Sequence, residues 1–121
     1  MEGLYHTAHI LVLPSLRETT GSVVTEAMVR GLPVILPNRF GGGQLVNGET
    51  GWLYSGGREA LAAVLRDAAS SREELARRGA NAAAAMKNHT WEVKAAHYQR
   101  IYETISDRRD SHAGFHCGAH L

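Results

Sequence analysis

Glu18 and Glu26 are the side chains whose type and spacing best suit chemistry, and seven residues separate them. Small or hydroxyl-bearing residues stand directly after the first acid: Thr19, Thr20, Gly21 and Ser22. The first main-chain N–H groups of a helix have no partner within it, so a helix that begins here can bind a phosphate group. An ionised carboxylate accepts hydrogen bonds from vicinal hydroxyls, as on a ribose. These residues together indicate a site for a ligand that carries both a phosphate group and vicinal hydroxyls, such as a nucleotide-sugar.

Both acids also have plain structural explanations. Glu26 and Arg30 are four residues apart, so they can pair on one helix face. Glu18 can simply favour the positive end of the helix dipole. Taken alone, the segment supports a ligand site and ordinary surface charge about equally.

Two short apolar runs must position these acids. Residues 10–13 and 34–36 are continuous apolar runs, typical of strands buried on both faces of a parallel sheet. The segment between them predicts a helix over about residues 21–30, ended by Gly31 and Pro33. Strand, helix and strand form a right-handed βαβ unit, so we expect an α/β fold with a partial Rossmann-like parallel sheet. Glu26 then lies near the strand ends, where open α/β sheets bind ligands.

The rest of the chain predicts one short strand, over residues 52–54, and three helices. The helices cover about residues 58–69, residues 71–87 behind a capping box, and residues from 90 onward. The last helix carries an apolar and aromatic stripe: Trp91, Ala95, Tyr98, Tyr102 and Ile105. After Ser106 the sequence is polar and aperiodic. We therefore expect a domain over residues 1–106 and a mostly disordered tail over residues 107–121.

Two other groups of residues could carry chemistry. The glycine run at residues 41–43 lets a main chain approach a ligand closely, but it matches no phosphate fingerprint and is by itself better explained as a surface turn. Histidines and one cysteine gather in the tail: His112, His116, Cys117 and His120. A metal site needs a folded scaffold, which the tail does not predict, so we expect no metal.

Composition narrows the class of protein. The 121 residues suit one domain, and a net charge of +1 gives no support for nucleic-acid binding. A single cysteine excludes an internal disulfide. No apolar run reaches the roughly 18 residues of a membrane span, and the start lacks a signal-peptide pattern. We expect a cytoplasmic protein.

In their order along the chain, these motifs resemble the carboxyl-terminal part of retaining glycosyltransferases of the GT-B fold, group 1 or family 4 type. The resemblance covers about residues 5–105. Its matching segments are residues 10–15, Glu18 with Glu26, residues 26–28, residues 31–35, Gly41 with Gly42, residues 48–51, and residues 98–102.

The resemblance implies roles for the residues at matching positions. Glu18 is then the catalytic acid that faces the donor sugar, and Glu26 holds the ribose hydroxyls. The residues at 19–22, with Gly41 and Gly42, form the rest of the donor site. The family generally needs no bound metal or other cofactor, and its donor substrate is a nucleotide-diphosphate sugar. The acceptor is a saccharide or a lipid-linked compound, as in polysaccharide biosynthesis.

The chain departs from this family in one loop and in length. Gln44 stands where family members commonly have a glutamate after the paired glycines. A GT-B enzyme has two Rossmann-like domains with the active site between them, and this chain matches only the last third. The acceptor domain and the basic residues that neutralise the diphosphate are absent. We therefore expect the isolated chain to be inactive.

A parallel sheet cut in this way exposes an edge, and the last helix exposes its aromatic stripe. We expect association with the missing amino-terminal half, with a partner subunit or with a second copy, any of which could hold the chain at a membrane surface. The alternative is a non-catalytic fragment that folds and oligomerises without binding a donor.

Overall fold

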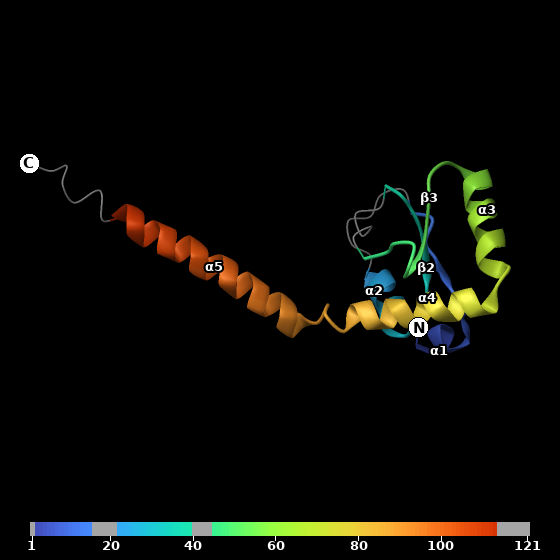
Figure 1. The fold of residues 1–121 in the computed structure, drawn as a ribbon, viewed down its shortest axis with the longest axis horizontal. Helices are drawn as coiled ribbons and strands as arrows, with labels where there is room; N and C mark the ends of the chain where they lie inside the picture. The colour runs from blue at the N-terminus through green and yellow to red at the C-terminus, as the bar shows by residue number, and fades with distance from the viewer. Residues whose placement is uncertain (1, 16–21, 40–44, 114–121) are drawn as a thin grey trace, which may run out of the picture. The chain divides into compact units, whose positions relative to one another are not determined.

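The computed structural model describes residues 2–15, 22–39 and 45–113 (Figure 1). The chain divides into two units, Met1–Asn88 and His89–Leu121, which are described separately. This boundary differs from the sequence-based expectation, which placed the division after Ser106.

A three-stranded parallel sheet forms the centre of the first unit. Its strands are β1 (Leu11–Val12), β2 (Val34–Pro37) and β3 (Gly51–Tyr54), in the order β1-β2-β3. Ile35 of β2 lies in register with Val12 on one side and with Trp52 on the other. The predicted α/β fold with a parallel sheet is confirmed.

Helices join and cover these strands. They are α1 (Glu2–Thr7), α2 (Ser22–Val29), α3 (Arg58–Ala69) and α4 (Arg72–Met86) in the first unit, and α5 (Trp91–Ala113) in the second. The helices predicted over 21–30, 58–69 and 71–87 are present, and Ser71 caps α4 by accepting a hydrogen bond from the main-chain N–H of Glu74. The sequence did not predict α1.

The central strand is buried on both faces, as its continuous apolar sequence predicts. Val34 and Leu36 pack in one cluster with apolar residues of α1, α2 and α4, including Met28 and Ala82. Ile35, on the opposite face, packs with Trp52 and with α3. Figure 1 accordingly shows α2 and α3 on opposite sides of the strands. This alternation follows from the two-residue period of a strand.

Gly31 ends α2 in a left-handed conformation, with φ of 77°. Its N–H donates to the carbonyl of Met28 at 3.0 Å, and the N–H of Leu32 donates to the carbonyl of Ala27 at 3.0 Å. This pair of hydrogen bonds is a Schellman motif, which satisfies carbonyl groups that the helix end would leave unpaired. The helix end predicted from Gly31 is confirmed.

α4 crosses the end of α2 at very close range. A Cβ atom built on Gly79 of α4 would overlap the main-chain oxygen of Gly31 and would lie 3.3 Å from Cδ of Pro33. Only a glycine allows this approach, because the overlapping atom is main chain and cannot rotate away. The contact therefore fixes the carboxyl end of α2 against α4.

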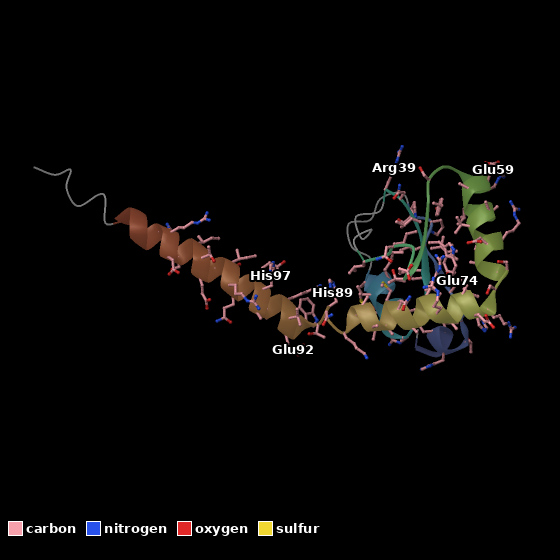
Figure 2. All side chains as sticks on the ribbon, in the orientation of Figure 1. Arg39, Glu59, Glu74, His89, Glu92 and His97 are labelled. Atoms are coloured by element: carbon pink, nitrogen blue, oxygen red, sulfur yellow. The ribbon has the colours of Figure 1, made fainter. Side chains whose placement is uncertain are left out.

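Charged side chains of α4 hold the turn that leads into β3. The guanidinium of Arg77 donates to Glu74 through two nitrogens and to Oε2 of Glu49 at 2.7 Å. Arg78 donates to Oε1 of Glu74 at 2.7 Å and to the carbonyl of Gly51 at 2.6 Å. Figure 2 labels Glu74 on α4, and Arg77 and Arg78 both donate hydrogen bonds to its carboxylate.

Trp52 extends the same network to α3. The guanidinium carbon of Arg78 lies 4.0 Å from the centroid of the Trp52 ring, and the indole Nε1–H donates to Oδ2 of Asp67 at 2.9 Å. A guanidinium over an indole is attracted by the ring's negative face. β3, α3 and α4 are thus joined by polar contacts as well as by the apolar core.

α5 continues to Ala113. The expectation of a disordered tail from Asp107 onward is corrected for residues 107–113, which are helical although polar; residues 114–121 lie outside the described part of the chain. Within its own unit, α5 leaves large apolar side chains exposed: Trp91, Val93, Tyr98, Ile101, Tyr102 and Ile105. In the described ranges, no helix is both long and apolar enough to cross a membrane.

Gly79→Ala should destabilise the first unit by about 1–3 kcal/mol, because the added methyl group overlaps main chain that must then shift. Urea unfolding followed by circular dichroism measures this change. Gly3→Ala in α1 is the matched control, since a Cβ there meets nothing within 4 Å. If Gly79→Ala and Gly3→Ala had equal free energies of unfolding, this would contradict the close approach of α4 to Gly31.

The network around Glu74 should weaken in acid. Hydrogen bonds from Arg77 and Arg78 lower the pKa of Glu74 from 4.5 to about 2. Between these values the unfolded chain binds more protons than the folded one, so protonation favours unfolding. We expect the stability advantage of the wild type over Glu74→Gln to be full above pH 4.5 and to disappear toward pH 2. An advantage that stays constant over this range, measured by urea unfolding, would contradict the network.

Candidate functional site

The structure describes two of the predicted site residues, Ser22 and Glu26, and places both on α2. Ser22 is the first residue of the helix, and Glu26 lies about one turn further along. The other predicted site residues lie outside the described ranges: Glu18, Thr19, Thr20, Gly21, Gly41 and Gly42. Their roles stay predictions.

The amino end of α2 lies at the carboxyl edge of the sheet. The other end of the helix joins the start of β2 through residues 30–33, so the helix starts on the side where the parallel strands end. Open α/β sheets bind ligands on that side. The main-chain N–H groups of the first turn point along the helix axis toward that side. Thr25 donates its hydroxyl hydrogen to the carbonyl of Ser22 at 2.9 Å, within the same first turn. This geometry suits an anionic group at the start of α2.

Glu26 is exposed, and its carboxylate has a partner from another helix. The hydroxyl of Tyr5 in α1 donates to Oε2 of Glu26 at 3.2 Å. The Tyr5 side chain is otherwise buried, and its ring belongs to the apolar cluster beneath α2. Sequence reasoning missed Tyr5, because a single tyrosine in a two-turn segment carries no pattern that links it to a distant acid.

Arg30 completes the surroundings of Glu26. Its Nη1 donates to the main-chain carbonyl of Glu26 at 3.0 Å, and its guanidinium carbon lies 4.9 Å from the centroid of the Tyr5 ring. This hydrogen bond goes to the main chain and differs from the side-chain pairing of Glu26 with Arg30 that the alternative explanation predicts. The Glu26 carboxylate itself contacts Tyr5.

Burial raises the pKa of Tyr5, and the hydrogen bond and negative charge of Glu26 raise it further, while the charge of Arg30 lowers it. The phenol therefore stays protonated at neutral pH. A protonated phenol beside an ionised carboxylate acts as the donor, which fixes the direction of the hydrogen bond between them.

A pocket of about 580 Å³ lies where the three strands end. Its lining comes from the carboxyl ends of all three strands and from the start of α3: Ser15, Pro37, Asn38, Arg39, Tyr54, Ser55, Gly56 and Gly57. The N–H of Asn38 donates to the carbonyl of Tyr54 at 2.8 Å, which holds two of these segments together. Hydroxyl, amide and guanidinium groups in this lining can hydrogen-bond a polar ligand.

Arg39 was not singled out from the sequence. It stands two residues after the end of β2, shortly before the glycine run, and Figure 2 shows it close to the upper ends of the strands. A basic residue within two positions of the end of a buried strand is the signal that could have found it, because open α/β sheets bind ligands at the ends of their strands.

The turn after the glycine run is built by its own side chains. Oδ1 of Asn47 accepts hydrogen bonds from the N–H groups of Glu49 and Thr50, at 2.8 and 3.2 Å. Thr50 is 4% exposed, and its hydroxyl donates to the carbonyl of Leu45 and accepts from the N–H of Asn47. Nδ2 of Asn81 in α4 donates to the carbonyl of Glu49. The chain therefore leaves the glycine run through a fixed turn.

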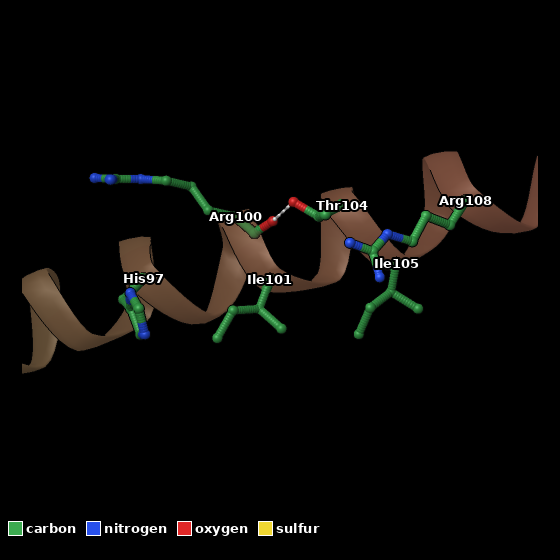
Figure 3. Close-up of a pocket in the computed structure, with 6 residues that line it drawn as sticks. All are labelled: His97, Arg100, Ile101, Thr104, Ile105 and Arg108. Carbon is green, nitrogen blue, oxygen red and sulfur yellow. Dashed lines mark hydrogen bonds between the residues drawn. The ribbon is translucent and has the colours of Figure 1, made fainter.

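A second hollow, of about 450 Å³, lies on α5 (Figure 3). One helix supplies all of its lining: His97, Arg100, Ile101, Thr104, Ile105 and Arg108. Figure 3 shows the side chains of Ile101 and Ile105 projecting on one side of the helix. Ligand sites are enclosed by several elements, so this hollow is a groove between neighbouring side chains and not a second candidate site.

Within the described ranges, no three histidine, cysteine, aspartate or glutamate side chains come together in a way that could hold a metal ion. The predicted tail residues His116, Cys117 and His120 lie outside these ranges.

Comparisons with known proteins agree on one family. Residues 1–85 match the family described as Glycosyl transferases group 1. D-inositol 3-phosphate glycosyltransferase of Streptomyces scabiei is 37% identical over 100 residues, which is 81% of this chain and 22% of that protein. The protein of the same name from Rhodococcus jostii is 38% identical over 94 residues, or 76% of this chain and 21% of that protein.

Two solved structures resemble the fold. Sucrose-phosphate synthase from Thermosynechococcus elongatus has a TM-score of 0.76 and 28% identity, and the match covers 87% of this chain and 27% of that one. Anabaena HepE in complex with UDP-glucose has a TM-score of 0.66 and 28% identity, over 86% of this chain and 29% of that one.

The chain thus spans about a fifth of the length of the curated relatives that it matches. The family match covers the strands, the helix that carries Ser22 and Glu26, and most of α4. The chain belongs to the group 1 glycosyltransferases, and its parallel sheet and helices are part of a GT-B domain of that family.

Proposed function

We propose that this chain is the donor-binding portion of a retaining glycosyltransferase and binds a nucleotide-diphosphate sugar at the carboxyl edge of its sheet. One observation carries the proposal: α2 starts at that edge with Ser22 and presents the exposed Glu26 one turn later, in a chain of the group 1 family. The solved relative HepE was crystallised with UDP-glucose, which supports a nucleotide-sugar as the ligand class.

The proposed roles of Ser22 and Glu26 follow the geometry of α2, and those of the other residues follow the family resemblance. The N–H groups of Thr20, Gly21 and Ser22 take the donor diphosphate, because a helix start offers unpaired donors and a positive dipole end. The carboxylate of Glu26 accepts the ribose hydroxyls. Glu18, on the preceding segment, faces the donor sugar as the catalytic acid. Gly41 and Gly42 let the main chain approach the same ligand. The reaction uses no metal or other cofactor.

The pocket at the strand ends supports this placement. It opens at the edge where α/β sheets bind ligands, and it offers the Ser15 hydroxyl, the Asn38 amide and the Arg39 guanidinium. A guanidinium suits an oxygen-rich or anionic ligand. We infer that part of the donor or of the reacting sugar lies in this pocket.

Transfer also needs an acceptor held against the donor sugar, since positioning supplies much of the rate. This chain spans 27% of sucrose-phosphate synthase and 29% of HepE, so the proposed active site requires further residues. A missing amino-terminal half, a partner subunit or a second copy supplies them. The isolated chain is then a donor-binding module that does not transfer the sugar.

The exposed apolar side chains of α5 favour a second candidate, a non-catalytic fragment that associates through this helix without binding a donor. Light scattering distinguishes the candidates when it is combined with nucleotide titration. An oligomer that binds no nucleotide supports the second candidate, and nucleotide binding in any assembly state excludes it.

The wild-type chain should bind at least one of UDP-glucose, GDP-mannose and ADP-glucose, and Glu26→Ala should weaken that binding by about tenfold or more, because a charged hydrogen-bond acceptor is lost. Chemical-shift titration by NMR measures binding even at millimolar Kd. Glu73→Ala, which removes an exposed glutamate in the first turn of α4, is the matched control and should bind as the wild type does. Equal binding by both variants would contradict the proposed role of Glu26.

A further inference from the structure

We propose that Tyr5 is a positioning residue for donor binding, whose hydroxyl holds the Glu26 carboxylate in the orientation that accepts the ribose hydrogen bonds. The proposal rests on the proposed function of Glu26 as the ribose-binding acid. In this role Tyr5 acts through Glu26 and makes no contact with the donor.

The contact joins two helices that are distant in sequence. Tyr5 in α1 and Glu26 in α2 are 21 positions apart, and their oxygen atoms lie 3.2 Å from each other. A carboxylate offers about four acceptor positions on its two oxygens, and the phenol uses one of them. The carboxylate thus keeps acceptor capacity for a ligand while one oxygen is held by the protein.

The need for a positioning group comes from the exposure of Glu26. A glutamate on an exposed helix face samples several rotamers, and a ligand that requires one of them must remove that freedom when it binds. A hydrogen bond from a fixed donor removes part of that freedom before the ligand arrives. Binding of the ribose is then stronger than an unrestrained glutamate would allow.

Tyr5 is suited to be that fixed donor, because its ring is anchored in the core. The side chain is 8% exposed and belongs to the apolar cluster that includes Val24 and Met28 of α2. α2 therefore supplies both the apolar residues in the cluster with the Tyr5 ring and the acid, Glu26, that the phenol contacts. The position of the phenol relative to Glu26 is set by core packing rather than by a loop.

Arg30 restrains the ring from another direction. Its guanidinium lies 4.9 Å from the ring centroid and also donates to the main-chain carbonyl of Glu26. The charge of Arg30 opposes the effects of burial and of Glu26 on the phenol, yet the pKa of Tyr5 remains raised. The hydroxyl therefore stays a hydrogen-bond donor across the neutral range.

Tyr5→Phe separates positioning from packing, since it removes the hydroxyl and keeps the ring against the core and Arg30. We expect the variant to bind UDP about threefold to tenfold more weakly than the wild type, as for the loss of one hydrogen bond. Its affinity for 2′,3′-dideoxy-UDP, which lacks the ribose hydroxyls, should stay within about twofold of the wild-type value. Tyr102→Phe on the exposed face of α5 is the control and should change neither affinity.

A double-mutant cycle checks that Tyr5 acts through Glu26. In a Glu26→Gln background, Tyr5→Phe should cause no further loss of UDP affinity. If the losses of UDP affinity add in the double variant, the Tyr5 hydroxyl does not act through Glu26 and the proposal is overturned. The proposal is also overturned if Tyr5→Phe weakens the binding of UDP and of 2′,3′-dideoxy-UDP equally, because the hydroxyl then only supports the fold.

A measurement without ligand separates this proposal from the proposed function. Glu26→Gln should lower the pKa of the Tyr5 phenol toward its ordinary value of 10, because a negative charge and its hydrogen bond are removed. NMR titration of ¹³C-labelled tyrosine measures this change, and the signal lost in Tyr5→Phe identifies the residue. An unchanged pKa would overturn the contact and the proposal with it. A lowered pKa in a chain that binds no nucleotide would instead overturn the proposed function, and with it the ribose role of Tyr5.

Discussion

The position of α2 depends on the main-chain contact between Gly31 and Gly79. The proposed ligand site at the amino end of α2 requires that the helix be held elsewhere, because side chains packed tightly around that end would occupy the space of the ligand. Here the opposite end is fixed: the Schellman motif at Gly31 turns the chain into β2, and α4 approaches the same residue without an intervening side chain. The start of α2 at Ser22 is thereby directed to the edge where the strands end.

The sequence predicted this part of the molecule well because its signals are local. Gly31 and Pro33 mark the end of α2, and the continuous apolar runs mark β1 and β2, whatever the rest of the chain does. The network of Arg78, Trp52 and Glu74 had no such signal. It joins β3 to α4 through side chains that are far apart in sequence, and only the assembled fold brings them together.

Two differences between the sequence-based expectations and the structure have the same physical origin. α1 spans only Glu2–Thr7, too few residues to show a helical period, so Tyr5 was missed together with its helix. The end of α5 was placed too early because residues 107–113 have no apolar stripe. A helix that is not required to bury a face can continue on the intrinsic preference of its residues, which an apolar period does not detect. Of the predicted site, the structure describes Ser22 and Glu26 in the expected helix, while the ligand roles of these two residues and of the other predicted site residues stay predictions.

The surroundings of Glu26 restrain a surface acid without burying it. Full burial of a carboxylate carries a large desolvation penalty. Here Glu26 remains exposed. Arg30 donates a hydrogen bond to its main-chain carbonyl, and Tyr5, whose ring packs in the core, donates one to its carboxylate. The restraint comes from the apolar cluster that also packs the inner face of α2, so a substitution that loosens that cluster would weaken the site without touching the acid. The packing of α1 against α2 and the orientation of the Glu26 carboxylate therefore depend on the same contacts, so the proposed role of Glu26 extends to a six-residue helix near the start of the chain.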